Sequence, residues 1–379
     1  MIPYGRQLLD DDDIKAVIEV LQSDWLTTGP KVVEFEKVFA KSVGAKYAIA
    51  VNSGTAALHA AMYAIGIKQG DEVIVPAISF AASANCVVFQ GGTPVFADVE
   101  SDTLLLDPIN VEQKITAKTK AIIAVDYAGQ PCDYDKLREI ATRHNLFLID
   151  DACHALGGSY KNHSVGSLAD LNIFSFHPVK HITTGEGGMI TTNNASFAEK
   201  MRAFRNHGIT TDHHQREAKG SWYYEMIDLG YNYRLTDFQC ALGLSQLSRL
   251  PQWITRRREI AEYYDKAFSE IREVIPLRVR PEVIHSYHLY VVRFDTEKIK
   301  KSRADIFTAF RNNGIGVNVH YIPIHLHPFY QRTFKTGPGL CPVAENAYKY
   351  IMSLPMFHGL GNDEAEKVIE AAKNIVNKS

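Results

Sequence analysis

A single lysine stands between an apolar run and a glycine-rich loop. Residues 174–188 have the sequence FSFHPVKHITTGEGG, with Lys180 at the transition. Most lysines are solvated surface residues. An amine that loses its water, however, has a lowered pKa and can act as a nucleophile or a base. The position of Lys180 therefore favours a desolvated, reactive amine.

Two further segments could place ligand-binding groups near such an amine. Residues 52–58, NSGTAAL, fit a strand-to-helix turn in which Gly54 lets the backbone approach a ligand and the helix N-terminus offers N–H groups to an anion. Residues 150–154, DDACH, follow the apolar run 146–149, and open α/β sheets bind ligands at the carboxyl ends of their strands. An acid there can pair with a protonated ring nitrogen. An ordinary turn explains the first segment equally well, and a helix N-cap explains the second.

A fourth segment, residues 230–235 with the sequence GYNYRL, opens a predicted helix. Asn232 offers an amide and Arg234 a guanidinium, both of which bind anions. A helix entry with a packed tyrosine accounts for the same residues, so this segment alone leaves both interpretations open.

Strands and helices must hold these segments together, and from about residue 45 apolar runs alternate with helical patterns. We expect helices at 53–65, 81–90 and 133–144. The expected strands are 47–51, 72–75, 94–97, 121–125, 146–150, 171–176 and 188–192. This alternation predicts an α/β domain with a largely parallel sheet that is buried on both faces.

The pattern changes near residues 246–253. A charged helix is expected at 254–268, followed by a strand at 288–294, a helix at 303–313, a strand at 316–320 and a last helix at 363–376. These elements predict a smaller α+β domain. A chain of 379 residues suits two domains, which we place at 1–250 and 251–379.

Composition excludes several classes of protein. Hydrophobic residues make up 46% of the chain, charged residues 22%, and the formal net charge is −2, so the basic face of a nucleic-acid-binding protein is not indicated. The 5 cysteines are scattered without a C-x-x-C pair, which favours a reducing cytoplasm over a disulfide framework or a zinc site. No apolar signal core or run of about 18 apolar residues is present, so we expect no membrane contact.

Together, in this order and spacing, the four segments resemble the fold type I enzymes that use pyridoxal 5′-phosphate (PLP). More narrowly, they resemble the sugar aminotransferases of the DegT/DnrJ/EryC1/StrS family, from residues 25–30, WLTTGP, to the C-terminal helix. The resemblance implies a large domain with a mostly parallel, seven-stranded type of sheet and a small α+β domain. It also implies a homodimer with active sites at the subunit interface.

The resemblance assigns a role to each candidate residue. Lys180 would hold the cofactor as a Schiff base, and Asp151 would keep the pyridine nitrogen protonated, so that the ring accepts electrons. His154 would lie near the ring hydroxyl, and Phe80 would stack on the ring. The residues implied to hold the phosphate are Gly54, Thr55, Ser175 and, from a partner subunit, Asn232.

The family also contains dehydratases, which carry a histidine where the aminotransferases carry the lysine. The spacing from Lys180 to the Glu186-Gly187-Gly188 segment supports the lysine as the matching residue, rather than the adjacent His181. Within the family, segments 125–129, 154–157 and 318–330 resemble the transaminases of pseudaminic acid biosynthesis. Asp150 and Cys153 depart from the wider family, which often has Glu and a small residue there.

This narrower resemblance implies that L-glutamate donates an amino group to the 4-keto group of a UDP-linked 4-keto-6-deoxy-N-acetylhexosamine. Another nucleotide-sugar 3- or 4-aminotransferase, of the perosamine or 4-amino-arabinose type, is the alternative. The residues expected to contact the nucleotide sugar are Thr27, Thr28, Arg234, His320 and Tyr321.

Some residues also fit two other classes of protein. His320, His325 and His327 lie close together, as in a metal hydrolase, but two prolines interrupt the segment and no carboxylate accompanies them. We therefore expect no metal. A non-catalytic binding protein on the same fold is also conceivable, since fold does not fix function. The presence of both Lys180 and Asp151 favours an enzyme.

Overall fold

The computed structural model describes residues 1–211, 216 and 220–377. Its centre is a seven-stranded sheet with the strand order β1-β9-β8-β5-β4-β2-β3. β9 runs antiparallel to both of its neighbours, and the other strands run parallel to one another. The strands are β1 (Tyr47–Val51), β2 (Glu72–Pro76), β3 (Thr93–Ala97), β4 (Thr119–Val125), β5 (Phe147–Asp151), β8 (Leu171–Ser175) and β9 (Gly188–Thr192). The expected α/β class with a mostly parallel sheet is confirmed.

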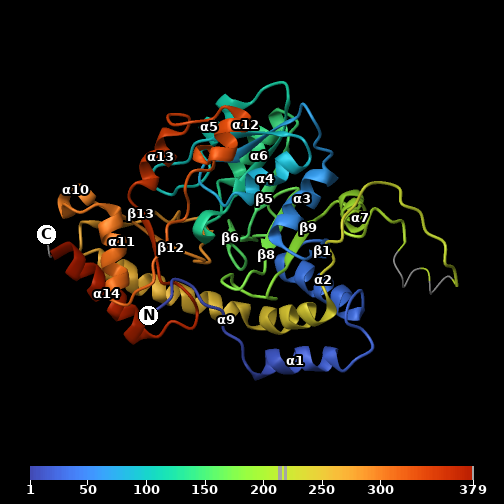
Figure 1. Ribbon diagram of the computed structural model, residues 1–379, viewed down its shortest axis with the longest axis horizontal. Coiled ribbons are helices and arrows are strands. Elements are labelled where there is room, and N and C mark those ends of the chain that lie inside the picture. Colours follow the sequence, from blue (N-terminus) through green and yellow to red (C-terminus); the bar gives the residue numbers. More distant parts are fainter. Residues whose placement is uncertain (212–215, 217–219, 378–379) are drawn as a thin grey trace.

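Helices cover both faces of this sheet (Figure 1). Because successive strand residues point to opposite faces, Ala48 and Ala50 of β1 pack in one apolar cluster with α2 (Pro30–Val43), whereas Ile49 and Val51 pack in another with α3 (Gly54–Ala64). The remaining helices of this part are α4 (Ala82–Phe89), α5 (Pro108–Lys114), α6 (Tyr134–Arg143) and α7 (Ala195–Phe204), with the short η1 (Tyr127–Gly129).

One long helix, α9 (Asp237–Phe268), runs beneath the sheet and continues into the C-terminal part (Figure 1). We expected a separate helix from 254 because of the change near 246–253, and this expectation was wrong. Pro251 lies inside the helix. The helix continues past it because the side chains of Leu247, Leu250 and Ile254, on the turns around Pro251, are buried in the core. α1 (Asp11–Leu21) packs along α9, where Gln246 donates to Asp13 at 2.5 Å.

The C-terminal part has its own antiparallel sheet and apolar cluster. Its sheet contains β10 (Val274–Pro276), β12 (Tyr290–Phe294) and β13 (Ile351–Leu354), and its helices are α10 (Thr296–Ile299), α11 (Arg303–Asn312) and α14 (Asn362–Asn377). η2 (Ile324–Leu326), α12 (Pro328–Phe334) and α13 (Pro342–Tyr348) instead pack on the core of the large sheet. α9 crosses residue 250 without a break, and the division at 250/251 stays a prediction.

The expected strand at 316–320 is a further correction. Only Asn318 pairs with Ser353, through backbone hydrogen bonds of 3.2 and 2.7 Å. The carbonyl of His320 accepts the Tyr127 hydroxyl in place of a backbone N–H of β13. A third small sheet joins β11 (Val283–Ile284), β6 (Ser159–Tyr160) and β7 (His163–Ser164).

No helix in the described part of the chain is both long enough and apolar enough to cross a membrane.

The packing of α2 on the sheet gives a test of the fold. Phe39 is fully buried, and its ring centroid lies 5.9 Å from Phe35, 5.0 Å from Phe174 and 5.6 Å from Phe176. We expect Phe39→Ala to destabilise the protein by about 3–5 kcal/mol, through lost transfer energy and a cavity, as measured by urea unfolding. The matched control is Val38→Ala on the same helix, which is exposed and should change stability by less than about 0.5 kcal/mol. Equal effects of the two changes would contradict this packing.

Candidate active site

A cavity of about 510 Å³ opens at the carboxyl ends of the parallel strands. The last residues of β4, β5 and β8, which are Val125, Asp151 and Ser175, line it. Ligands of open α/β sheets bind at this edge. The candidate residues brought together in its wall are Gly54, Thr55, Phe80, Asp151, His154, Ser175, Lys180, His320 and Tyr321.

Lys180 supplies the amine of this cavity. It lies in the turn after β8, where its backbone N–H donates to the His177 carbonyl at 2.9 Å. Burial lowers the pKa of its amine, and the nearby Cys153 and Asp151 oppose that shift. His181 does not line the cavity; it is buried, with Nε2 3.2 Å from the Ser286 carbonyl. The structure therefore presents Lys180, and not its histidine neighbour, to a ligand.

Two serines that we did not predict orient Asp151. The Ser83 hydroxyl donates to Asp151 Oδ2 at 2.6 Å, and the Cys153 backbone N–H lies 3.4 Å from Oδ1. The Ser79 and Ser83 hydroxyls are 2.6 Å apart, so Ser79 is left to donate to Ser83. Ser79 precedes α4 and Ser83 lies in its first turn, so no helical spacing in the sequence marks the pair.

The turn after β1 forms a cradle that only a small residue can complete. A Cβ atom on Gly54 would lie 2.9 Å from the Ser175 Cβ, so the two segments approach closely because Gly54 has no side chain. Ser53 caps α3 by accepting the Ala56 N–H at 3.0 Å, and Gly54 and Thr55 line the cavity. The free N–H groups of a helix N-terminus favour an anion such as a phosphate.

A neutral imidazole and two aromatic rings complete one wall. His154 is buried, and its Nε2 lies 3.1 Å from the Tyr321 hydroxyl. Burial first, and then the charge of Lys180, hold the pKa of His154 well below its usual range. The Phe80 ring is 60% exposed and lies 6.1 Å from the Tyr321 ring, so it can cover the face of a bound ring. His288, which we did not predict, also lines the cavity, with its ring 4.3 Å from His154.

Other candidate residues do not reach this cavity. Thr28 and Arg234 line a second cavity of about 520 Å³, where Arg234 donates to Asn206 at 2.7 Å. Thr27 is paired with Thr236 ahead of α9. Asn232 is exposed, and its carbonyl accepts from Asn52 at 3.4 Å. Within one protomer, these four residues therefore do not line the cavity that contains the amine of Lys180.

Two of the three histidines predicted as possible metal ligands have different side-chain partners. His320 Nδ1 is 2.8 Å from the Ser353 hydroxyl, and His325 Nε2 is 2.9 Å from Glu345 Oε1. Among the residues that the structure describes, no group of three or more His, Cys, Asp or Glu side chains is arranged to hold a metal ion.

Three known proteins similar to this chain are named as aminotransferases or as acting in polysaccharide biosynthesis. The spore coat polysaccharide biosynthesis protein SpsC of Bacillus subtilis is 43% identical over 377 residues, which cover 99% of this chain and 97% of SpsC. Helicobacter pylori PseC, an aminotransferase involved in the biosynthesis of pseudoaminic acid, has a solved structure with a TM-score of 0.93 and 34% identity, and each chain is fully covered.

Spr1654 of Streptococcus pneumoniae, described as a sugar aminotransferase, gives a TM-score of 0.94 with 33% identity in its PMP form, again over the full length of both chains. It has also been solved in a PLP form. The cofactor of this family is PLP, and the cavity here offers what PLP needs: a desolvated amine, a carboxylate and a glycine-lined helix N-terminus. The profile of the DegT/DnrJ/EryC1/StrS aminotransferase family matches residues 7–373, and the chain belongs to that family.

Proposed function

We propose that this enzyme transfers an amino group from L-glutamate to the 4-keto group of a UDP-linked 4-keto-6-deoxy-N-acetylhexosamine. The observation that carries an amino-group transfer is the meeting of Lys180 and Asp151 in one cavity, close enough for the carboxylate to act on the pKa of the amine. The similarity to PseC and SpsC supports a sugar as the acceptor.

PLP supplies an aldehyde carbon and an electron-withdrawing ring when it is bound. Lys180 would hold this group through its amine, and Asp151, fixed by Ser83, would keep the ring nitrogen cationic. Phe80 would cover the ring, and His154 would face its hydroxyl. Gly54, Thr55, Ser175 and the Asn232 side chain of a second subunit would hold the phosphate.

The amine of Lys180 then carries the protons. Its lowered pKa increases the neutral fraction, so Nζ can take a proton from the Cα of glutamate and later deliver one to C4 of the sugar. Because His154 is neutral, it places no positive charge beside the reacting amine of Lys180. Tyr321, hydrogen-bonded to His154, fixes the orientation of the imidazole.

Exposed apolar side chains support a homodimer. Trp222, Ile227 and Leu229 are 84%, 67% and 68% exposed in the segment that leads to Asn232. Large exposed apolar side chains are typical of interaction sites, and a twofold interface contacts the same residues on both copies. In this arrangement Asn232, which does not line the cavity of its own chain, reaches the cavity of the partner.

A spectral half-reaction tests the proposed substrates. L-Glutamate should convert the lysine-bound cofactor of the purified enzyme to its amine form, with loss of the visible band. The band should return with the UDP-linked 4-keto-6-deoxy-N-acetylhexosamine. Related keto sugars, including precursors of perosamine and of 4-amino-arabinose, are offered in parallel. Recovery only with one of these would replace the proposed acceptor.

Lys180→Ala tests the role of the amine. We expect loss of the visible band and a fall in turnover of at least about 10²-fold, because one side chain serves as both tether and proton carrier. The control, Lys68→Ala, removes an exposed lysine and should leave both measurements unchanged. Wild-type turnover in Lys180→Ala would end the proposal.

Mixing two impaired variants tests the shared site. Lys180→Ala and Asn232→Ala should each be impaired, but a heterodimer of the two has one site with both native residues. After random reassortment, we expect about a quarter of the wild-type activity in the glutamate half-reaction. No recovery, with heterodimers shown to be present by mass spectrometry, would mean that Asn232 does not act across the interface.

A further inference from the structure

Two buried carboxyl groups behind the site have oxygens without partners. Asp150 and Asp126 are both 0% exposed. Neither oxygen of Asp150 has a hydrogen-bond partner, and neither does Oδ2 of Asp126. A buried ionised oxygen without a donor is costly, so these three atoms require an explanation.

The sheet brings the two groups together. β4 and β5 are parallel, with Ala124 paired to Asp150 and Val125 to Asp151. Asp126 directly follows β4, two residues after Ala124, and its backbone N–H donates to the Asp151 carbonyl at 3.2 Å. Successive strand residues point to opposite faces of the sheet, so Asp150 and Asp151 lie on opposite faces. Asp150 lies on the same face as its paired residue Ala124. The negative charge of Asp126 acts directly on Asp150.

The two carboxyl groups differ in the donors that they receive. Asp126 Oδ1 accepts the Cys132 backbone N–H at 2.9 Å and the Tyr134 hydroxyl at 3.0 Å, as an anion would. Burial raises the pKa of Asp126 to about 7 in spite of these donors. Burial, and then Asp126 itself, raises the pKa of Asp150 well above its usual range, although the Tyr134 hydroxyl acts in the opposite direction. Two neighbouring buried carboxyl groups cannot both ionise cheaply.

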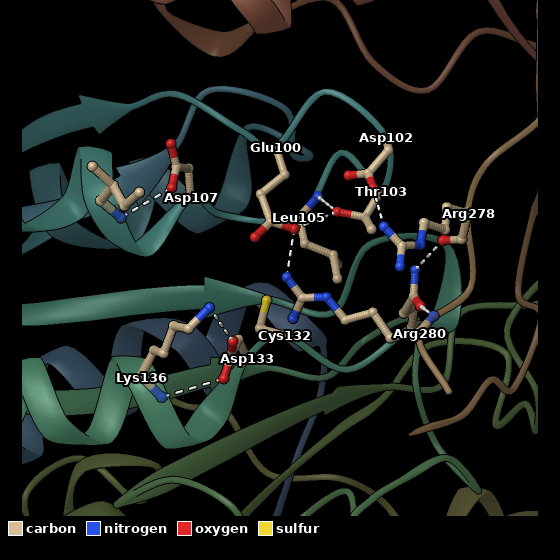
Figure 2. Close-up of polar contacts among 12 residues, drawn as sticks. Glu100, Asp102, Thr103, Leu105, Asp107, Cys132, Asp133, Lys136, Arg278 and Arg280 are labelled. Carbon is tan, nitrogen blue, oxygen red and sulfur yellow. Dashed lines mark hydrogen bonds and ion pairs between the residues drawn. The ribbon is translucent and has the colours of Figure 1, made fainter. Parts of the chain in front are cut away.

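Arg280 is the cation that acts on the neighbouring Cys132 thiol. Its guanidinium pairs with Glu100 through one nitrogen (Figure 2), and its Nη1 is buried without a hydrogen-bond partner, so it donates to neither carboxyl group. Tyr134 from α6, Cys132 from the preceding loop and Asp151 from β5 are the other titratable groups facing the pair. No cation among these groups therefore balances the negative charge of the two carboxyl groups.

We propose that Asp126 and Asp150 share one proton, with Asp150 as the neutral acid that donates its O–H to Asp126 Oδ2. The bare Oδ2 then has a donor, and the pair carries one negative charge in place of two. Asp126 and Asp150 are positioning residues, because the shared proton ties the end of β4 to the end of β5, where Asp151 begins the cofactor-binding segment. Only this link to cofactor binding rests on the proposed function; the proton itself does not.

Infrared spectroscopy of the purified enzyme at pH 7 tests the proton directly. We expect the carbonyl band of a protonated carboxylic acid, shifted in D2O, and its loss in Asp150→Asn, whose amide can donate to Asp126 in place of the acid. Asp98→Asn is the matched control, since buried Asp98 already accepts backbone N–H groups at both oxygens and should contribute no such band. An absent band, or one unchanged in Asp150→Asn, would overturn the proposal.

The dependence of stability on pH provides a second readout. The folded pair binds more protons than the unfolded chain, so its contribution is present at low pH and is lost as pH rises through the raised pKa values. Between pH 7 and pH 9 the wild-type unfolding midpoint should fall by roughly 2–4 °C more than that of Asp150→Asn. Asp150→Ala, which leaves Asp126 Oδ2 bare, should melt below Asp150→Asn at pH 7. Parallel wild-type and Asp150→Asn profiles would contradict the shared proton.

The two proposals fail separately. If the acid band is lost in Asp150→Asn but the enzyme aminates none of the sugars offered, the proposed substrate is wrong and the shared proton stands. If the enzyme aminates the sugar but shows no acid band, the proposed function stands and the shared proton is wrong.

Discussion

The site depends on two parallel strands that lie next to each other. β5 ends in Asp151 and β8 ends in Ser175, and Lys180 follows in the next turn. Because both strands point the same way, their carboxyl ends open at one edge of the sheet, and a carboxylate and an amine 29 positions apart in the sequence line one cavity. Any change in the order of these strands would separate the two groups.

Glycines bring the opposite wall close enough to complete this cavity. β9 lies between β1 and β8 and runs antiparallel to both, so its first residue meets the turn after β1. A Cβ on Gly188 would lie 2.4 Å from the Ser53 carbonyl oxygen, and one on Gly54 would lie 2.9 Å from Ser175. With side chains at these two positions, the N-terminus of α3 could not approach β8, and the anion cradle would be too wide.

Burial has opposite consequences for the bases and acids around this edge. It lowers the pKa of Lys180 and of His154, which keeps both groups available as neutral bases. It raises the pKa of Asp126 and Asp150, which have no cation beside them among the described residues. Asp151, by contrast, lines the cavity and accepts hydrogen bonds at both oxygens, from Ser83 and from the Cys153 backbone.

The sequence by itself determined the elements of the sheet and most of the cavity. Apolar runs bounded by turns located the strands of the large sheet to within about two residues, because a parallel sheet buried on both faces requires such runs. Lys180, Asp151 and Gly54 were found because each lies where such a strand ends. The resemblance of the motifs to one family then supplied the cofactor, which periodicity alone could not.

Tertiary structure decided what depends on distant partners. Ser83 is recognisable only once α4 packs beside β5, and the buried faces of Leu250 and Ile254 carry α9 through Pro251. The expected strand at 316–320 failed because the His320 carbonyl accepts Tyr127, almost 200 residues away, in place of a neighbouring strand. The orphaned oxygens of Asp126 and Asp150 likewise exist only in the folded chain, since local sequence does not reveal which donors reach a buried carboxyl group.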